Sequence, residues 1–180
     1  MTIYDALEKD HEKIESLLDQ LVSSAQSDSD EWKSLVDRIA DELVPHARAE
    51  EALFYNPIRD SAQGKSLISH SYAEHARAES ELRSLQARES VDAEWTRLAK
   101  KLRDDLLRHV ETEETEVFDV AKKIFSENDA IQIGEAFDAL KSIVRKQTFV
   151  GPGYDLVVDL VPKRMRDGIK TQLSQLKKSA

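Results

Sequence analysis

Apolar residues recur at three- and four-residue steps through most of this chain, and this periodicity constrains the fold more than any other feature. A run with that spacing places its apolar side chains along one face of an α-helix. Five runs have it: residues 7–21, 32–57, 67–85, 95–124 and 133–144. Short polar stretches separate them. Four helices joined by short loops predict an up-down-up-down four-helix bundle in which each helix buries its apolar face.

Turn-forming residues are scarce. The 180 residues include five Gly and four Pro, less than half of typical usage. Because sandwiches and barrels need a turn every few residues, this scarcity argues against an all-β fold and favours an all-α one. Pro45 falls inside the second run, where a proline removes a backbone hydrogen bond and predicts a kink at a cost of roughly 3 kcal/mol.

The composition changes after residue 150. Residues 151–180 hold three of the five Gly, two of the four Pro, and six Lys and Arg against three Asp, although the whole chain has a net charge of −9. We therefore expect a four-helix bundle over residues 1–125 and one or two additional helices, packed on the bundle, within residues 126–180.

The composition also excludes several classes of protein. Without Cys, the chain cannot form disulfides, thiol nucleophiles, zinc fingers or iron–sulfur clusters. The net charge of −9 argues against nucleic acid as a partner, and no stretch of about 18 apolar residues is present that would span a membrane. Acidic residues within the first ten positions do not fit a secretory signal, so we expect a soluble, cytoplasmic protein.

Histidine and glutamate occur at repeated positions on the predicted core faces. Four of the five His lie there, one on each of the first four runs: His11, His46, His75 and His109. Glu50 and Glu113 follow the second and fourth of these by four residues, which puts each HxxxE pair on one helix face. The lone His precedes the HxxxE pair by 35 residues in the first half and by 34 in the second. The chain is therefore interpreted as two helical hairpins that present the same three residues to a shared axis.

This constellation predicts a metal site. A single HxxxE pair is common on helix surfaces, and a single His on an apolar face is usually a hydrogen-bonded core residue. Six such residues repeated in register are different, because a buried carboxylate costs several kcal/mol unless it is paired or binds a metal. No Lys or Arg shares these faces to pair with both Glu. Imidazole and carboxylate together suit iron, manganese, zinc or copper, and two carboxylates on opposite helices can each bridge two metals. Two irons offer about twelve coordination positions. Two bridging Glu and four His would fill eight of them, and an oxide or hydroxide bridge would fill two more, which leaves two open.

The sequence resembles the hemerythrin-like HHE cation-binding domain. The resemblance rests on Asp10-His11, residues 46–55 (HARAEEALFY), Glu74-His75 and residues 109–114 (HVETEE), and it covers roughly residues 1–125. It implies a four-helix bundle around a non-haem di-iron centre with an oxo or hydroxo bridge. By the same resemblance, Glu50 and Glu113 bridge the two Fe ions and the four His are terminal ligands. Within the family, the chain is most similar to the small single-domain mycobacterial proteins.

The chain departs from oxygen-carrying hemerythrins on the third helix. Those proteins have five His ligands, two of them a turn apart on that helix, whereas here Ser71 and Glu79 stand four residues on either side of His75. His70 is five residues from His75, about 140° round the helix, and is expected to flank the site.

Tyr55 is a candidate replacement for the missing ligand. It stands where the second half of the chain has Phe118. In an ideal helix it lies about 140° off the face of Glu50, so bending near Pro57 would be needed to bring its oxygen inward. The alternative is a packed aromatic residue with its hydroxyl at the rim.

These features predict a protein that binds and reacts with small oxygen or nitrogen oxide species (H2O2, O2 or NO). Since fewer His are present than in an oxygen carrier, the resemblance favours catalase-like peroxide decomposition or NO handling over O2 storage. Whether the protein is an enzyme stays open. The alternative is an iron- or oxygen-sensing or O2-binding module without turnover, and a third interpretation is a metal-free helical scaffold.

Overall fold

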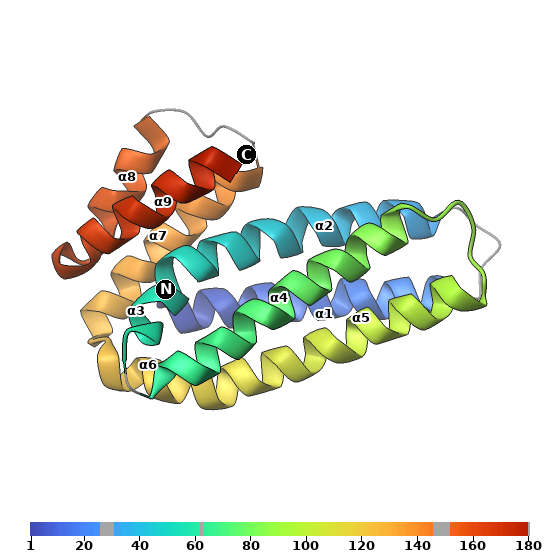
Figure 1. The fold of residues 1–180 in the computed structure, drawn as a ribbon, viewed down its shortest axis with the longest axis horizontal. Coiled ribbons are helices and arrows are strands. Elements are labelled where there is room, and N and C mark those ends of the chain that lie inside the picture. Colours follow the sequence, from blue (N-terminus) through green and yellow to red (C-terminus); the bar gives the residue numbers. More distant parts are fainter. Residues whose placement is uncertain (26–30, 62, 146–151, 180) are drawn as a thin grey trace.

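The computed structural model describes residues 1–25, 31–61, 63–145 and 152–179, and within these ranges the secondary structure is helical. Four long helices form an elongated bundle in which successive helices run in opposite directions (Figure 1). They are α1 (Ile3–Ser24), α2 (Glu31–Glu50), α4 (Gly64–Gln86) and α5 (Ala93–Thr112). The predicted all-α, up-down-up-down bundle is confirmed.

Local sequence signals begin two of these helices. The Thr2 side chain accepts a hydrogen bond from the Asp5 backbone N–H, and the Asp5 carboxylate accepts one from the Thr2 backbone in return. Asp92 caps α5 in the same way, accepting from the Trp95 backbone N–H at 2.6 Å. Each cap satisfies N–H groups that have no partner within the helix and so favours the start at that residue.

Two π-helical segments interrupt the α-helices at matching positions in the two halves. The first, Glu51–Tyr55, joins α2 to the short helix α3 (Asn56–Arg59), and the second, Glu113–Val117, joins α5 to α6 (Phe118–Ile124). By contrast, α2 continues through Pro45, so the helix departs from α-helical geometry six residues later than the sequence predicts. Single π turns occur frequently at functional sites.

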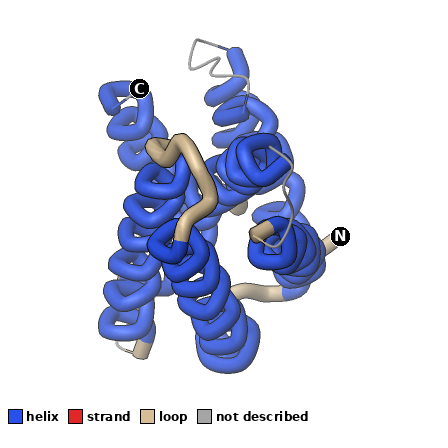
Figure 2. Tube along the Cα trace, turned by 90° about the vertical axis from the view of Figure 1, so that its right-hand side faces the viewer, coloured by secondary structure: helices blue, strands red, loops and turns tan. Residues whose placement is uncertain are grey.

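A further helical layer covers one end of the bundle, which confirms the predicted additional C-terminal helices. It consists of α7 (Glu127–Arg145), α8 (Pro152–Leu160), a 3-10 turn (Lys163–Met165) and α9 (Arg166–Ser179). Helix α7 packs against α1 and α2, and α9 contacts the first π segment (Figures 1 and 2). Gly134 permits this packing, because a Cβ atom there would lie 2.8 Å from the Met1 carbonyl oxygen.

The bundle interior has two apolar clusters with a polar layer between them. One cluster lies toward the α1–α2 and α4–α5 loops and includes Leu18, Ile39 and Trp95. The other lies toward α7 and includes Leu7, Phe54 and Phe137. Between the two clusters, the helices contribute buried His and Glu side chains. Within the described ranges, no helix is both long and apolar enough to cross a bilayer.

Candidate metal centre

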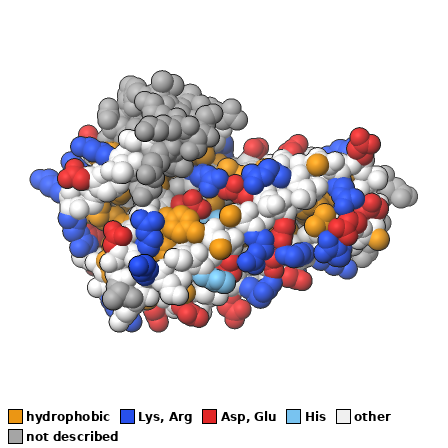
Figure 3. Space-filling view, in the orientation of Figure 1, with side chains coloured by type: hydrophobic (Ala, Val, Ile, Leu, Met, Phe, Trp, Pro, Cys, Tyr) orange, Lys and Arg blue, Asp and Glu red, His pale blue; other side chains and the backbone are white. Residues whose placement is uncertain are grey.

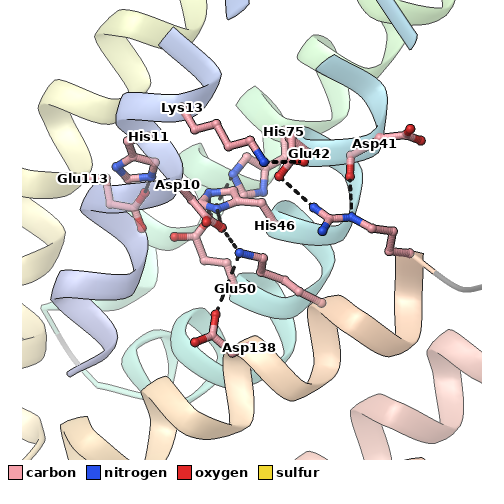
Figure 4. A network of polar contacts seen from close by, with 12 residues as sticks. Asp10, His11, Lys13, Asp41, Glu42, His46, Glu50, His75, Glu113 and Asp138 are labelled. Atoms are coloured by element: carbon pink, nitrogen blue, oxygen red, sulfur yellow. Dashed lines mark hydrogen bonds and ion pairs between the residues drawn. The ribbon is translucent and has the colours of Figure 1, made fainter. Parts of the chain in front are cut away.

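The polar layer consists of the six residues singled out by the sequence repeat, hereafter the His/Glu cluster. All six residues are buried, with exposed fractions between 0% and 3%: His11, His46, Glu50, His75, His109 and Glu113. They come from α1, α2, α4, α5 and the start of the second π segment, and several of them are drawn together in Figure 4. The fold therefore places every one of the predicted His and Glu residues in one compact layer.

The cluster divides into two groups that share one carboxylate. His11, His46 and Glu50 offer ligand atoms that all lie within 4.8 Å of one another, and so do Glu50, His75 and His109. Glu113 belongs to neither group, yet its Oε2 is 3.4 Å from His11 Nε2 and 3.7 Å from His109 Nε2. Each group has the ligand types and the size of a metal site.

The Nε2 atom of each histidine faces a carboxylate of the cluster. His75 Nε2 lies 3.3 Å and His46 Nε2 lies 3.6 Å from Glu50 Oε2. With the two distances to Glu113, all four imidazoles direct the same atom toward the interior of the layer.

The Nδ1 atom of each histidine is bound by a second set of acids, hereafter the partner carboxylates. The four pairs are His11–Glu114 at 2.8 Å, His46–Asp10 at 3.2 Å, His75–Glu51 at 3.0 Å and His109–Glu74 at 2.9 Å. A carboxylate that accepts from Nδ1–H orients the ring and leaves the Nε2 lone pair for a metal.

The partner carboxylates follow the internal repeat. Asp10 and Glu74 each precede a lone His and bind the second His of the same half. Glu51 and Glu114 each follow a cluster Glu and bind the lone His of the opposite half. Sequence reasoning did not assign these roles, although the acid–His and Glu–Glu doublets were visible in the repeat.

Burial and neighbouring charges shift the pKa values of several cluster residues. Burial raises the pKa of Glu50 well above its ordinary value, and the negative charge of Glu113 raises it further. Burial lowers the pKa of His11, but the adjacent Glu113 carboxylate and the hydrogen bond to Glu114 outweigh burial and raise that pKa to about 10. Burial lowers the pKa of His46 to about 4. A metal bound here would therefore displace a proton held between His11 and Glu113.

The cluster also contains polar atoms that lack hydrogen-bond partners among the described residues. These atoms are both carboxylate oxygens of Glu50, both of Glu113, His11 Nε2 and the Tyr55 hydroxyl. Buried polar atoms in native structures are nearly always satisfied, and four carboxylate oxygens next to imidazole Nε2 atoms match the donor set that a cation would satisfy. The residues present thus fit a metal site.

Tyr55 lies beside this layer because of the first π segment. In a π turn, residues five apart are hydrogen-bonded neighbours, so Tyr55 falls one turn along from Glu50 instead of 140° away. Its ring stacks on His75 with centroids 5.5 Å apart, and its hydroxyl is buried without a hydrogen-bond partner in the described ranges. Burial, and then the charges of Glu113 and Glu50, raise its pKa well above the ordinary value. No sequence signal used above indicated the π turn.

His70 lies outside the cluster. Its side chain is 63% exposed, and its Nε2 is 3.1 Å from Glu74 Oε1. Ser71, one turn before His75, is buried and donates to the Leu67 carbonyl oxygen.

A small cavity, hereafter the histidine cavity, borders the cluster. It has a volume of about 10 Å³, close to that of one water molecule. Its walls are His11, Ile14, Glu15, Leu18, Leu43, His46, His75, Leu106, His109 and Val110. The four candidate His ligands therefore share a mostly apolar space large enough for a very small molecule.

Comparison with known proteins agrees with this geometry. The family described as the hemerythrin HHE cation binding domain matches residues 2–121. A protein of Nostoc sp. described as a DNA nickase is 26% identical over 147 residues, which cover 82% of this chain and 41% of that relative. The chain thus spans less than half the length of that relative, and no solved structure matches significantly. With two thirds of its length matched by the family, and with His and Glu residues grouped as a cation site requires, this chain belongs to the hemerythrin HHE cation-binding domain family.

Proposed function

We propose that the His/Glu cluster holds two iron ions and that the centre binds and reacts with small oxygen or nitrogen oxide species, with decomposition of H2O2 as its reaction. The observation that carries the proposal is the presence of two three-residue groups that share Glu50. A carboxylate common to both groups can bridge two ions, which is the arrangement of di-iron sites in helical bundles.

The donor set favours an open centre. Four imidazoles and two bridging carboxylates supply eight ligand positions, and an oxide or hydroxide bridge would supply two more. Two six-coordinate irons need about twelve, so two positions remain for small molecules. The bound iron supplies Lewis acidity and electron transfer. The protein orients the imidazoles through the partner carboxylates and keeps water out with the two apolar clusters.

The additional helices support this centre. Lys141 on α7 binds Asp10, the partner carboxylate of His46. The Phe137 ring packs edge-on against His46, with centroids 5.7 Å apart. We propose that residues 126–180 are a supporting layer for a metal-binding unit over residues 1–125.

Tyr55 is proposed as a further ligand. Its hydroxyl is buried and has no hydrogen-bond partner among the residues that the structure describes, and its ring stacks on that of His75. A phenolate bound to iron would give a visible charge-transfer band, so the colour of the iron-loaded protein tests the proposal.

Iron or oxygen sensing without turnover is the second candidate. Two buried carboxylates without hydrogen-bond partners among the described residues would make stability depend on a bound cation, and a partner protein could recognise the ordered state.

Strand nicking is suggested by the name of the Nostoc relative, but the geometry opposes it. The cluster residues are at most 3% exposed, so a phosphodiester backbone cannot reach them. Acidic and basic side chains intermix on the face shown in Figure 3, without the large basic patch of a nucleic-acid site. The absence of a nucleic-acid partner stays a prediction.

Metal analysis after anaerobic iron loading tests the proposal. We expect about two irons per chain, loss of iron in His46→Ala and full loading in His70→Ala, which removes the same side chain outside the cluster. Fewer than about one iron per chain would overturn the di-iron centre. Release of O2 from H2O2 by the loaded wild type, but not by His46→Ala, would support turnover. Full loading without O2 release would leave sensing as the function.

A further inference from the structure

The histidine cavity has one wall residue that is not buried. Nine of its ten wall residues are buried, and the tenth, Glu15 on α1, is half-buried. Glu15 follows His11 by one helical turn, and because it is the partly exposed wall residue, we take its side of the cavity as the side that is open to solvent. A molecule that enters the cavity from this side passes Glu15 before it meets an imidazole.

The charge of Glu15 has no compensating partner in the part of the chain that the structure describes. No hydrogen bond or ion pair joins it to another residue of the described ranges. Lys13, two residues before Glu15, binds Glu42 at 2.7 Å. Arg103 binds Asp19, one helical turn after Glu15, at 2.6 Å. A lone carboxylate beside an apolar cavity sets a negative potential at its mouth, because low-dielectric walls concentrate the field.

We propose that Glu15 is a specificity-determining residue that slows the entry of small anions into the histidine cavity and admits uncharged molecules. The inference rests on the proposed function, because it assumes that small molecules reach the centre by way of this cavity. Its chemistry selects neutral species, such as O2, NO and H2O2, over anions of similar size. One unit charge near the path changes an anion's association rate by about fivefold in a water-like dielectric, and by more where the wall is dry.

Association rates of azide and nitric oxide with the iron-loaded chain test the inference. Azide is an anion and nitric oxide is neutral, and both change the absorption of an iron centre on binding. In stopped-flow measurements, Glu15→Gln should raise the azide association rate by about fivefold, and Glu15→Lys should raise it further. The nitric oxide rate should change by less than about twofold in both variants. Added salt should raise the azide rate of the wild type but not that of Glu15→Gln.

Glu12→Gln is the matched control. Glu12 is an exposed acid on the same helix that does not line the cavity, so its removal changes the net charge equally. Equal azide rates in the wild type and Glu15→Gln, or an equal increase in Glu12→Gln, would overturn the proposed role of Glu15 without contradicting the proposed iron centre. If the iron-loaded wild type binds neither azide nor nitric oxide, both the proposed role of Glu15 and the proposed open iron centre are wrong. Iron content and circular dichroism confirm that each variant is folded and loaded.

Discussion

Replacement of Glu50 by Gln should make the metal-free protein more stable and abolish its stabilisation by metal. Glu50 is fully buried, and both of its oxygens lack a hydrogen-bond partner among the described residues. Gln has nearly the same shape and, like a protonated carboxyl, can donate to Glu113. The substitution therefore removes a titratable charge while the packing of the site is kept.

The size of the effect follows from proton linkage. The folded chain raises the pKa of Glu50 above its unfolded value of 4.5, so the folded state binds more protons and loses stability as the pH rises above that value. The largest loss in the free energy of unfolding at pH 7 is about 3 kcal/mol. It applies if the Glu50 carboxyl of the folded protein stays protonated from pH 4.5 to pH 7. For a chain of this length, a full effect raises the melting temperature of Glu50→Gln by roughly 10 °C. Near pH 4.5 the two proteins should melt together.

Thermal unfolding of chelator-treated protein between pH 4.5 and 8 measures this difference. Ferrous iron at about 100 times its dissociation constant should add roughly 2.7 kcal/mol to the wild type. It should add nothing to Glu50→Gln, which lacks the carboxylate shared by both groups. Glu111→Gln, an exposed acid on α5, should follow the wild type in every measurement. A metal-free Glu50→Gln that is less stable than the wild type at pH 7, or that keeps the metal-induced shift, would refute the reasoning.

Three further substitutions probe other parts of the structure. Tyr55→Phe should leave the iron content unchanged but remove the visible charge-transfer absorption, and an unchanged spectrum would make Tyr55 a packed aromatic. Gly134→Ala should destabilise the fold by about 1–3 kcal/mol in thermal unfolding, since its Cβ would lie 2.8 Å from the Met1 carbonyl oxygen; an unaffected melting temperature would contradict the close packing of α7 on α1. Burial raises the pKa of Asp10, but its hydrogen-bonded partners, Lys141 among them, lower it to about 2. A depressed pKa stabilises the fold above pH 3.8, so Lys141→Met should lower the free energy of unfolding by about 1–2 kcal/mol at pH 7, as measured by urea unfolding. This loss of stability should shrink as the pH falls from 4 towards 2, and added salt alone should not remove it.

The periodicity of the sequence determined the bundle and the composition of its polar layer. Helical spacing depends only on which residues follow one another, and His46 and Glu50 share a face in any α-helix. The repeat of the two halves then indicated that both HxxxE pairs meet at one axis. The burial of Glu50 and Glu113 between apolar clusters agrees with that prediction.

Contacts between distant segments were decided only by the tertiary structure. The partner carboxylates Glu51 and Glu114 bind histidines in the opposite half of the chain, so their roles depend on how the two hairpins pack. The contact of Lys141 with Asp10 joins residues 131 positions apart and depends on the docking of α7.

The position of Tyr55 also depends on the tertiary structure and not on local sequence alone. An ideal α-helix directs it away from Glu50, whereas the π turn brings it beside His75. A π turn inserts one residue into the hydrogen-bonding pattern and is maintained by surrounding packing, for which local sequence carries no clear signal. The half-buried position of Glu15 likewise depends on the walls that four helices build around one cavity. The order of residues along the chain therefore determined which side chains each helix directs toward the core. The packing of the helices decided which of these side chains contact one another, because contacts across a bundle depend on helix docking and not on neighbours along the chain.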